Sequence, residues 1–172
     1  SARRTDPEYL RDAEVQLRLW RHRETMLVGS VARRFKRRVD DGMDSFEAMI
    51  EVQDHLVTTA RAHIERVILE QFIEAVDGCE DDALRARLDE LRALFGLWHT
   101  SRDMGWFMEN SLIEAPQAKA MRTEINELCY QVRQQAVHLV DAYGIPESCL
   151  GAPIAYSPVV EPRHPHDEPA AE

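Results

Sequence analysis

Residues 7–41 read PEYLRDAEVQLRLWRHRETMLVGSVARRFKRRVDD, and this stretch decides the fold class. Its only proline stands at the first position and it has a single glycine, so almost nothing in it breaks a helix. Apolar side chains recur at spacings of three, four and multiples of these, which is the period of one helix face. They are Leu10, Ala13, Leu17, Trp20, Leu27, Val31 and Phe35. The pattern predicts a helix from Pro7 to Asp40, roughly 50 Å long unless it breaks near Gly29 and Ser30.

A second long helix is predicted to begin at Asp44 or Ser45, residues that cap helix N-termini. It ends at Asp77 and Gly78, where glycine can adopt the left-handed conformation that closes a helix. Its apolar stripe consists of Phe46, Met49, Ile50, Leu56, Val57, Ala60, Ile64, Val67 and Phe72. This stripe is expected to face the core.

Two more helices complete the set. The third starts in the acidic triplet 80–82, which is favourable at a helix N-terminus. Its stripe is Leu84, Leu88, Leu91, Phe95 and Trp98. The fourth begins near Ala115 and is closed by Gly144 and Pro146. Its stripe is Met121, Ile125, Leu128, Val132, Ala136, Leu139, Val140 and Tyr143.

Four amphipathic helices with short connections bury their stripes best as an antiparallel four-helix bundle. The predicted fold is therefore all-α, with breaks near 40–44, 78–81 and 104–115. The apolar stretch 103–110 is expected to fold onto the bundle. Residues 1–156 form this domain, and residues 157–172, rich in proline and charge, form a disordered C-terminal tail.

The composition excludes several classes of protein. The 172 residues carry a net charge of −10, although residues 1–38 are basic, so a general nucleic-acid binder is not expected. No apolar run approaches the ~18 residues of a membrane span. Three cysteines without Cys-x-x-Cys spacing indicate reduced thiols. With no secretory signal, the predicted location is cytoplasmic; a start at Ser1 fits removal of an initiator Met, or truncation.

No residue of this chain is predicted to be catalytic or to bind metal. A di-metal bundle needs Glu-x-x-His pairs on helices, and the only such pair is Glu161 with His164, in the predicted tail. His164 and His166 could bind metal only adventitiously. Nucleophile-elbow, phosphate-loop and dinucleotide motifs are absent from the sequence.

The strongest cluster of charge is Arg33-Arg34-Phe35-Lys36-Arg37-Arg38. It could contact a CoA phosphate or a nucleic-acid backbone. The interpretation favoured here is a solvated helix face, because cations are favourable at a helix C-terminus.

Two polar residues fall among apolar stripes. Glu24 lies between Trp20 and Leu27, and His63 lies one turn from the position opposite Glu24 in a hairpin that turns near Gly42. A buried acid needs a partner, so we expect Glu24 to make a structural contact with Thr59, Arg61, His63 or one of their neighbours. A role in proton transfer or ligand lining is the less favoured alternative.

Several motifs resemble a known family. They are Ala60-Arg61-Ala62-His63 followed by Val67 and Phe72, the turn Asp103 to Glu109, the run Leu139-Val140-Asp141-Ala142-Tyr143-Gly144-Ile145-Pro146, and Ala152-Pro153-Ile154-Ala155. With them, residues 93–155 resemble the C-terminal domain of acyl-CoA oxidases, and residues 45–76 the helix that precedes it. The last 15 or so residues have no counterpart, and the chain lacks the Ser-Lys-Leu ending of peroxisomal members.

The resemblance implies part of an FAD-dependent enzyme of fatty-acid β-oxidation. In that family a glutamate removes the α-proton of a fatty acyl-CoA, FAD accepts the β-hydride, and oxygen or an electron-transfer flavoprotein reoxidises the flavin. The catalytic glutamate and most of the flavin site are expected upstream of Ser1, so Glu24 and Glu109 are not assigned as the base. The implied partners are the upstream flavin-binding domains and a second copy of the enzyme.

Such a domain is expected to expose an apolar patch for its neighbours, around Trp106, Phe107 and Ile154. A non-catalytic helical interaction module is the alternative function. FAD is expected as a cofactor only if the chain is part of an acyl-CoA oxidase. The sequence leaves oxidase and dehydrogenase open.

Overall fold

The computed structural model of the chain describes residues 3–146, 149 and 151. Every regular element in these residues is a helix, which confirms the all-α prediction. The helices are α1 (Pro7–Arg11), α2 (Ala13–Asp40), α3 (Ser45–Glu51), α4 (Gln53–Asp77), α5 (Asp82–Arg102), α6 (Met104–Glu109), α7 (Ala115–Arg133) and α8 (Ala136–Asp141). The chain divides into two compact units, Ser1–Gln134 and Gln135–Glu172. The predicted boundary at 156/157 and the predicted tail lie outside the described residues.

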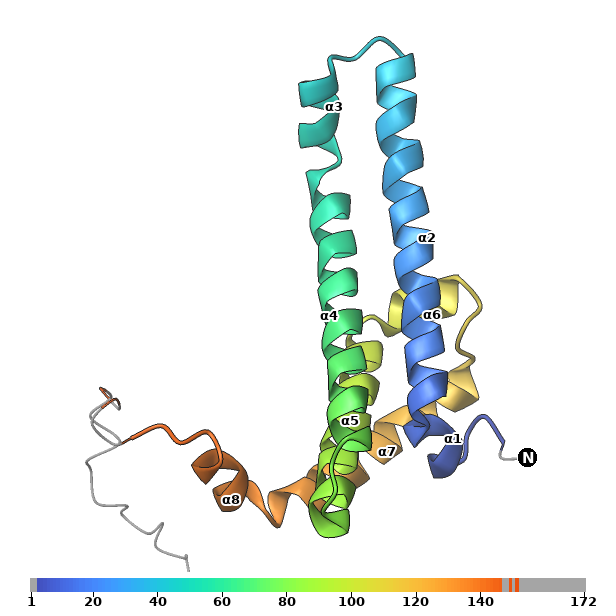
Figure 1. Cartoon of the computed structure of the whole chain (residues 1–172). Helices are drawn as coiled ribbons and strands as arrows, with labels where there is room; N and C mark the ends of the chain where they lie inside the picture. Colours follow the sequence, from blue (N-terminus) through green and yellow to red (C-terminus); the bar gives the residue numbers. More distant parts are fainter. Residues whose placement is uncertain (1–2, 147–148, 150, 152–172) are drawn as a thin grey trace, which may run out of the picture. The chain divides into compact units, whose positions relative to one another are not determined.

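In the first unit, α2 and α4 run side by side in opposite directions and form a long hairpin (Figure 1). The turn is closed by Gly42, whose φ of 91° suits glycine. The backbone N–H of Gly42 donates to the Val39 carbonyl and that of Met43 to the Arg38 carbonyl, each at 3.0 Å. These are the two bonds of a Schellman motif. The predicted break at 40–44 is confirmed.

The predicted first helix is interrupted at Asp12, and it continues unbroken through Gly29. Asp12 is extended, with ψ of 124°, and its carboxylate accepts a hydrogen bond from the Val15 backbone N–H at 2.8 Å. It thus ends α1 and caps α2, because an N-cap residue leaves the helical conformation. In the sequence, the start of α2 is indicated by Asp12, a capping residue, followed by the apolar residues of the helix.

Other boundaries also differ from the prediction. The second helix is divided at Val52, which has φ of −104° and no glycine or proline beside it. Gly78 closes α4 with φ of −79°, so the expected left-handed conformation is wrong. The Cys79 N–H bonds to the Val76 carbonyl at 3.2 Å, and this right-handed turn leads to Asp81, which caps α5. The break at 78–81 is confirmed.

The predicted fourth helix ends ten residues early. α7 stops at Arg133, and the residues after Gln135 form the short α8 in the second unit. The expected stripe from Ala136 to Tyr143 therefore does not belong to the same helix as Met121, Ile125 and Leu128. Nothing in the local sequence explains the interruption.

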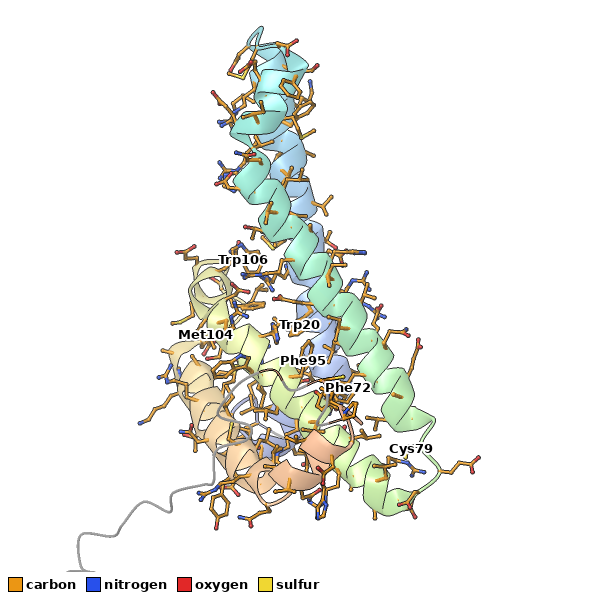
Figure 2. The ribbon with its side chains drawn as sticks, turned by 90° about the vertical axis from the view of Figure 1, so that its left-hand side faces the viewer. Trp20, Phe72, Cys79, Phe95, Met104 and Trp106 are labelled. Carbon is orange, nitrogen blue, oxygen red and sulfur yellow. The ribbon has the colours of Figure 1, made fainter. Side chains whose placement is uncertain are left out.

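The core of the first unit lies where α1, the start of α2, α5, α6 and α7 meet. Trp20 lies at its centre and is 2% exposed; its indole N–H donates to the Thr100 hydroxyl at 2.9 Å. Phe95 packs against Trp20 with ring centroids 5.7 Å apart and contacts Phe72 of α4 at 6.4 Å (Figure 2). These rings join α5 to the hairpin; Trp20 is buried, while Phe72 and Phe95 are partly buried.

The face of α4 that meets α2 is not the predicted stripe. Its buried residues, with those of α3, are Ala48, Val52, Thr59, Ala62, Glu65, Leu69 and Val76. Consecutive members of this set are spaced by three, four or seven residues, the spacing of a coiled-coil seam. Small side chains in this seam allow α2 and α4 to approach closely. The larger apolar residues predicted to be core mostly lie on other faces.

Close approach of α2 to α5 depends on Gly96. A methyl group at this position would lie 2.1 Å from Oε1 of Gln16. The Gln16 amide nitrogen donates to the carbonyls of Leu10 at 2.9 Å and Ala93 at 3.3 Å, and its oxygen accepts from Arg92 at 3.0 Å. The buried amide is fully satisfied, as a polar group in a core must be.

Candidate functional site

The predicted contact of Glu24 with the second helix is confirmed. Its carboxylate lies 2.7 Å from Nδ1 of His63 and forms an ion pair with Arg66. Arg66 also pairs with Glu70, which pairs with Arg21 at 2.9 Å. These charges form a ladder along one side of the α2–α4 hairpin and fix the register of the two helices.

The electrostatics of this ladder favour a structural role. Burial alone would raise the pKa of Glu24, but the hydrogen bonds and charges of His63 and Arg66 hold that pKa below its usual value. The pKa of Glu70 is lowered in the same way by Arg21 and Arg66, and the pKa of Arg66 is raised by the two carboxylates. A carboxylate with a lowered pKa is a weak base near neutral pH, which supports the structural interpretation.

A second, deeper ionic network was not predicted. Arg23 of α2 is 2% exposed and donates to Glu65 at 3.0 Å and to Asp103 at 2.5 Å. Arg61 binds Asp103 at 2.9 Å and Glu65 at 3.4 Å, and Nδ1 of His99 lies 3.1 Å from Glu65. Two acids thus neutralise two arginines where α2, α4 and α5 meet. Arg61, considered above as a partner of Glu24, belongs to this network.

The signal for Arg23 was present in the sequence. It lies three residues after Trp20 and four before Leu27, and so on the same stripe. Its Nε is buried without a hydrogen-bond partner within the described chain, although its guanidinium lies over the Phe107 ring at 5.7 Å. Such a cation–π contact partly offsets the lost hydrogen bond.

The aromatic turn at 103–110 folds onto the bundle as predicted, as helix α6. Phe107 is fully buried and Trp106 is partly buried, with their rings perpendicular at 5.3 Å. The expected apolar patch around these two residues is therefore wrong. The third member of that patch, Ile154, lies outside the described residues.

Exposed apolar surface lies instead on α3 and α4. The face opposite the seam carries Phe46, Ile50, Val57, Ile64 and Ile68, which are 43–69% exposed. A flank of the same hairpin forms an apolar hollow of about 290 Å3, lined by residues such as Val28, Phe35, Met49 and Leu56. Large apolar side chains exposed along one helix face are typical of surfaces that pack on other protein.

The basic run at 33–38 is only partly neutralised. Lys36 pairs with Asp40 and Arg38 with Glu51, each at 2.7 Å. Arg34 contacts Ser30 at 3.4 Å, while Arg33 and Arg37 form no ion pair with described residues. The run ends α2, where cations are favourable, so the solvated interpretation is retained.

The described residues hold no group of three His, Cys, Asp or Glu side chains placed to bind a metal, and Glu161, His164 and His166 lie outside them. Cys79, Cys129 and Cys149 are free thiols. In this part of the chain no helix has the length and apolarity needed to cross a bilayer.

The fold and these surfaces define a class of protein: an all-helical domain held by internal ion pairs, with apolar faces directed outward. Comparison with known proteins identifies the family. The model of the acyl-CoA oxidase family matches residues 12–157. Acyl-coenzyme A oxidase 2, peroxisomal, of Arabidopsis thaliana is 36% identical over 155 residues, 90% of this chain and 22% of the relative. Peroxisomal acyl-coenzyme A oxidase 1 of Homo sapiens is 32% identical over 97 residues, 56% of this chain and 15% of the relative.

The chain belongs to the acyl-CoA oxidase family, and it spans about a fifth of the length of these relatives. Solved structures support the fold. Acyl-CoA oxidase 1 of Yarrowia lipolytica superposes with a TM-score of 0.77 at 23% identity, over 87% of this chain and 22% of that one. Acyl-CoA oxidase 1 of Arabidopsis thaliana gives a TM-score of 0.72 at 22% identity, over 81% of this chain and 21% of that one.

Proposed function

We propose that this chain is the C-terminal helical domain of a flavin-dependent acyl-CoA oxidase of fatty-acid β-oxidation, and that it is not catalytic alone. The observation that carries the proposal is the outward apolar face of α3 and α4, from Phe46 to Ile68, on a chain that spans a fifth of its relatives. A domain that completes a larger enzyme needs such a face to dock on its sister domains.

FAD is the cofactor of the complete enzyme in this proposal. The described residues do not fit it by themselves, because the hollows among them have volumes of only about 250–330 Å3. Drug-sized ligands occupy roughly 300–1,000 Å3, and FAD is larger than most of them. The glutamate that removes the substrate proton and most of the flavin contacts are assigned to upstream domains.

The partners follow from the same proposal. They are the upstream flavin-binding domains, a second copy of the enzyme, and fatty acyl-CoA as substrate. In the assembled enzyme α2, α4, α5 and α7 act as an antiparallel four-helix bundle. A cytoplasmic location is kept as part of the proposal; the names of several relatives place those proteins in peroxisomes, so microscopy of the tagged protein is the test.

Incubation of residues 1–172 with FAD and palmitoyl-CoA under air tests the proposal. The expected result is a colourless protein that forms no peroxide, because catalysis of this type needs a positioned base and a positioned electron acceptor. Co-expression with the flavin-binding region encoded upstream should give a yellow complex that produces peroxide. A yellow, active isolated chain would overturn the proposal.

The second candidate is a non-catalytic helical interaction module. The ion pairs between its own helices favour this candidate, because charges that are paired within the domain need no partner from another domain. A monomeric chain that binds no flavin-containing region, with no such region encoded upstream, would support this module.

A further inference from the structure

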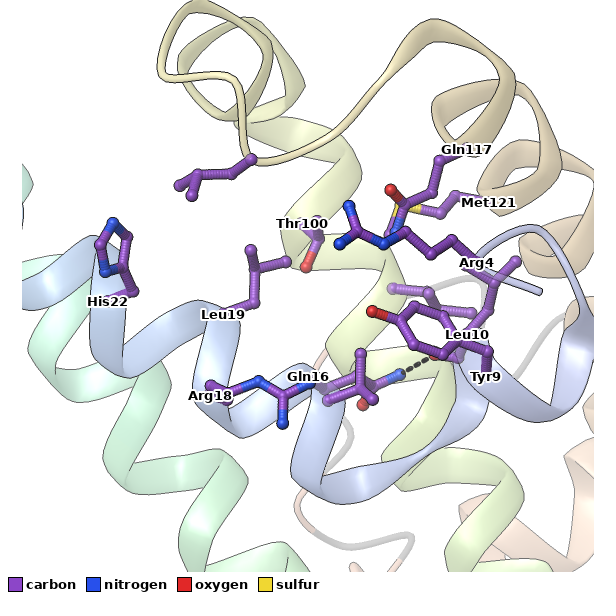
Figure 3. A pocket seen from close by; sticks show the side chains of 13 residues that line it. Arg4, Tyr9, Leu10, Gln16, Arg18, Leu19, His22, Thr100, Gln117 and Met121 are labelled. Carbon is purple, nitrogen blue, oxygen red and sulfur yellow. Dashed lines mark hydrogen bonds between the residues drawn. The ribbon is translucent and has the colours of Figure 1, made fainter. Parts of the chain in front are cut away.

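A pocket of about 250 Å3 opens where α1, the start of α2, α5 and α7 meet (Figure 3). Its apolar wall consists of Leu10, Leu19, Leu97, Leu112 and Met121. It lies at the base of the α2–α4 hairpin, and Leu10, Leu97 and Met121 in its wall belong to the buried core of the first unit. A hollow in this position is backed by rigid core rather than by loops.

The polar residues of the pocket are basic or neutral. Arg4, Arg18 and His22 line it, and none of its 13 residues is acidic. None of these three side chains forms an ion pair or hydrogen bond with a described residue. In a chain with net charge −10, a hollow bordered by two unpaired guanidinium groups has a locally positive potential and attracts anions.

Gln117 provides an independent observation. It is 7% exposed, it lines the pocket, and its side-chain amide has no hydrogen-bond partner among the described residues. The other buried polar groups of the pocket are satisfied: Thr100 bonds to Trp20 and Gly96, and Gln16 has three partners. Neither amide atom is among the fully buried, unpaired side-chain atoms of the described residues, where Arg23 Nε is found, so the amide of Gln117 reaches the solvent of the pocket and is available to a ligand. Figure 3 shows Gln117 and Arg4 among the residues that line the pocket.

We propose that this pocket binds a small amphipathic anion, with its carboxylate or phosphate head near Arg4, Arg18 and the Gln117 amide. The short aliphatic body lies against the leucines and Met121. The volume is below the roughly 300 Å3 at which drug-sized ligands begin, so a body of about six carbons fits better than a long acyl chain. The site goes beyond the proposed function, because it takes no part in the oxidation of acyl-CoA.

The test is a titration of the 15N-labelled chain, residues 1–172, with hexanoate. The indole N–H of Trp20 donates to Thr100, which lines the pocket, and its NMR signal reports on binding. A saturable shift is expected. Hexanamide has the same body without the charge, and acetate has the charge without the body, and each should bind at least ten times more weakly. Hexyl phosphate, titrated in parallel, decides which head is preferred.

Variants separate the site from a general charge effect. Arg18→Gln and Gln117→Met should each weaken hexanoate binding at least fivefold, because each removes a donor to the head. Arg33→Gln, on an unpaired arginine in the upper part of the same helix, is the matched control and should leave binding unchanged. Circular dichroism checks that each variant is folded. Because the Arg18 side chain is exposed, Arg18→Gln should not unfold the chain. No saturation, equal binding of hexanamide, or equal weakening by Arg33→Gln would each overturn the proposal.

Discussion

At the scale of single residues, the ionic contacts of Glu24 make the hairpin sensitive to acid. Because the folded state holds the pKa of Glu24 below its usual value, the folded carboxylate binds a proton less readily than the unfolded one. Its contribution to stability is therefore complete above the unfolded pKa of roughly 4.3. It is lost as the pH falls through the lower pKa of the folded state. Glu70 acts in the same direction.

Replacement of Glu24 by Gln should lower the free energy of unfolding by about 1–3 kcal/mol at pH 7, since it removes charge-assisted hydrogen bonds. Urea unfolding at several pH values measures this. The difference between wild type and Glu24→Gln should shrink as the pH falls from about 5 towards 3. Glu109→Gln, on an exposed carboxylate that has no partner among the described residues, is the control. A difference that stays constant over this range would contradict the role of the ion pair.

Arg23 tests the deeper network. Its replacement by Met leaves Glu65 and Asp103 with fewer cations, and loss of one partner from a buried pair costs about 3–5 kcal/mol. The double variant Arg23→Met/Glu65→Leu should lose less stability than the sum of the two single variants. Guanidinium unfolding of all four proteins gives the coupling energy. Additive losses would mean that the two side chains contribute independently.

At the scale of elements, Gly96 fixes the distance between α2 and α5. Gly96→Ala places a methyl group 2.1 Å from Oε1 of Gln16, and should destabilise the chain by about 1–3 kcal/mol through overpacking. Gly105→Ala in α6 meets no atom within 4 Å and should be neutral, or stabilising by about 0.5–1 kcal/mol, because alanine favours a helix. Thermal unfolding compares the two. Equal melting temperatures would show that α2 and α5 can separate at little cost.

At the scale of the whole molecule, the outward face of α4 is expected to hold the domain in its enzyme. The variants Val57→Lys and Ile64→Lys each introduce a charge on this face, where Val57 is 68% exposed and Ile64 is 54% exposed. The free energy of unfolding of the isolated chain should change by less than about 0.5 kcal/mol. Binding to the upstream flavin-binding region should fall at least tenfold, because a charge would be buried without a partner. Calorimetry of the two purified parts measures the binding.

Thr58→Lys is the matched control for that surface. Thr58 neighbours Val57 but is on a flank of α4 away from the outward face. It should leave binding to the flavin-binding region intact. Equal loss of binding with all three variants would indicate a general effect of charge, and no loss with any would place the docking surface elsewhere.

The sequence by itself determined the helical class, the break around Gly42, the start of α5 and the contact of Glu24 with the second helix near His63. These depend on local chemistry or on counting residues from one turn: a Schellman glycine, a capping aspartate, and positions counted outward from the hairpin tip. Acyl-CoA oxidase family membership could also be inferred from the sequence, because it rests on motifs that keep their order along the chain.

Only the tertiary structure decided which face of α4 is buried. Residues such as Val57 and Ile64 form as good a stripe as Ala62 and Leu69, and a helix that is apolar on two sides gives the same period for both. The choice was made by α2, whose Arg23 and Glu24 need the charges that flank the seam at Glu65 and Arg66. Burying an unpaired charge costs more than exposing an isoleucine. The pairing of charges therefore turned the smaller residues inward and left the larger apolar ones on the surface.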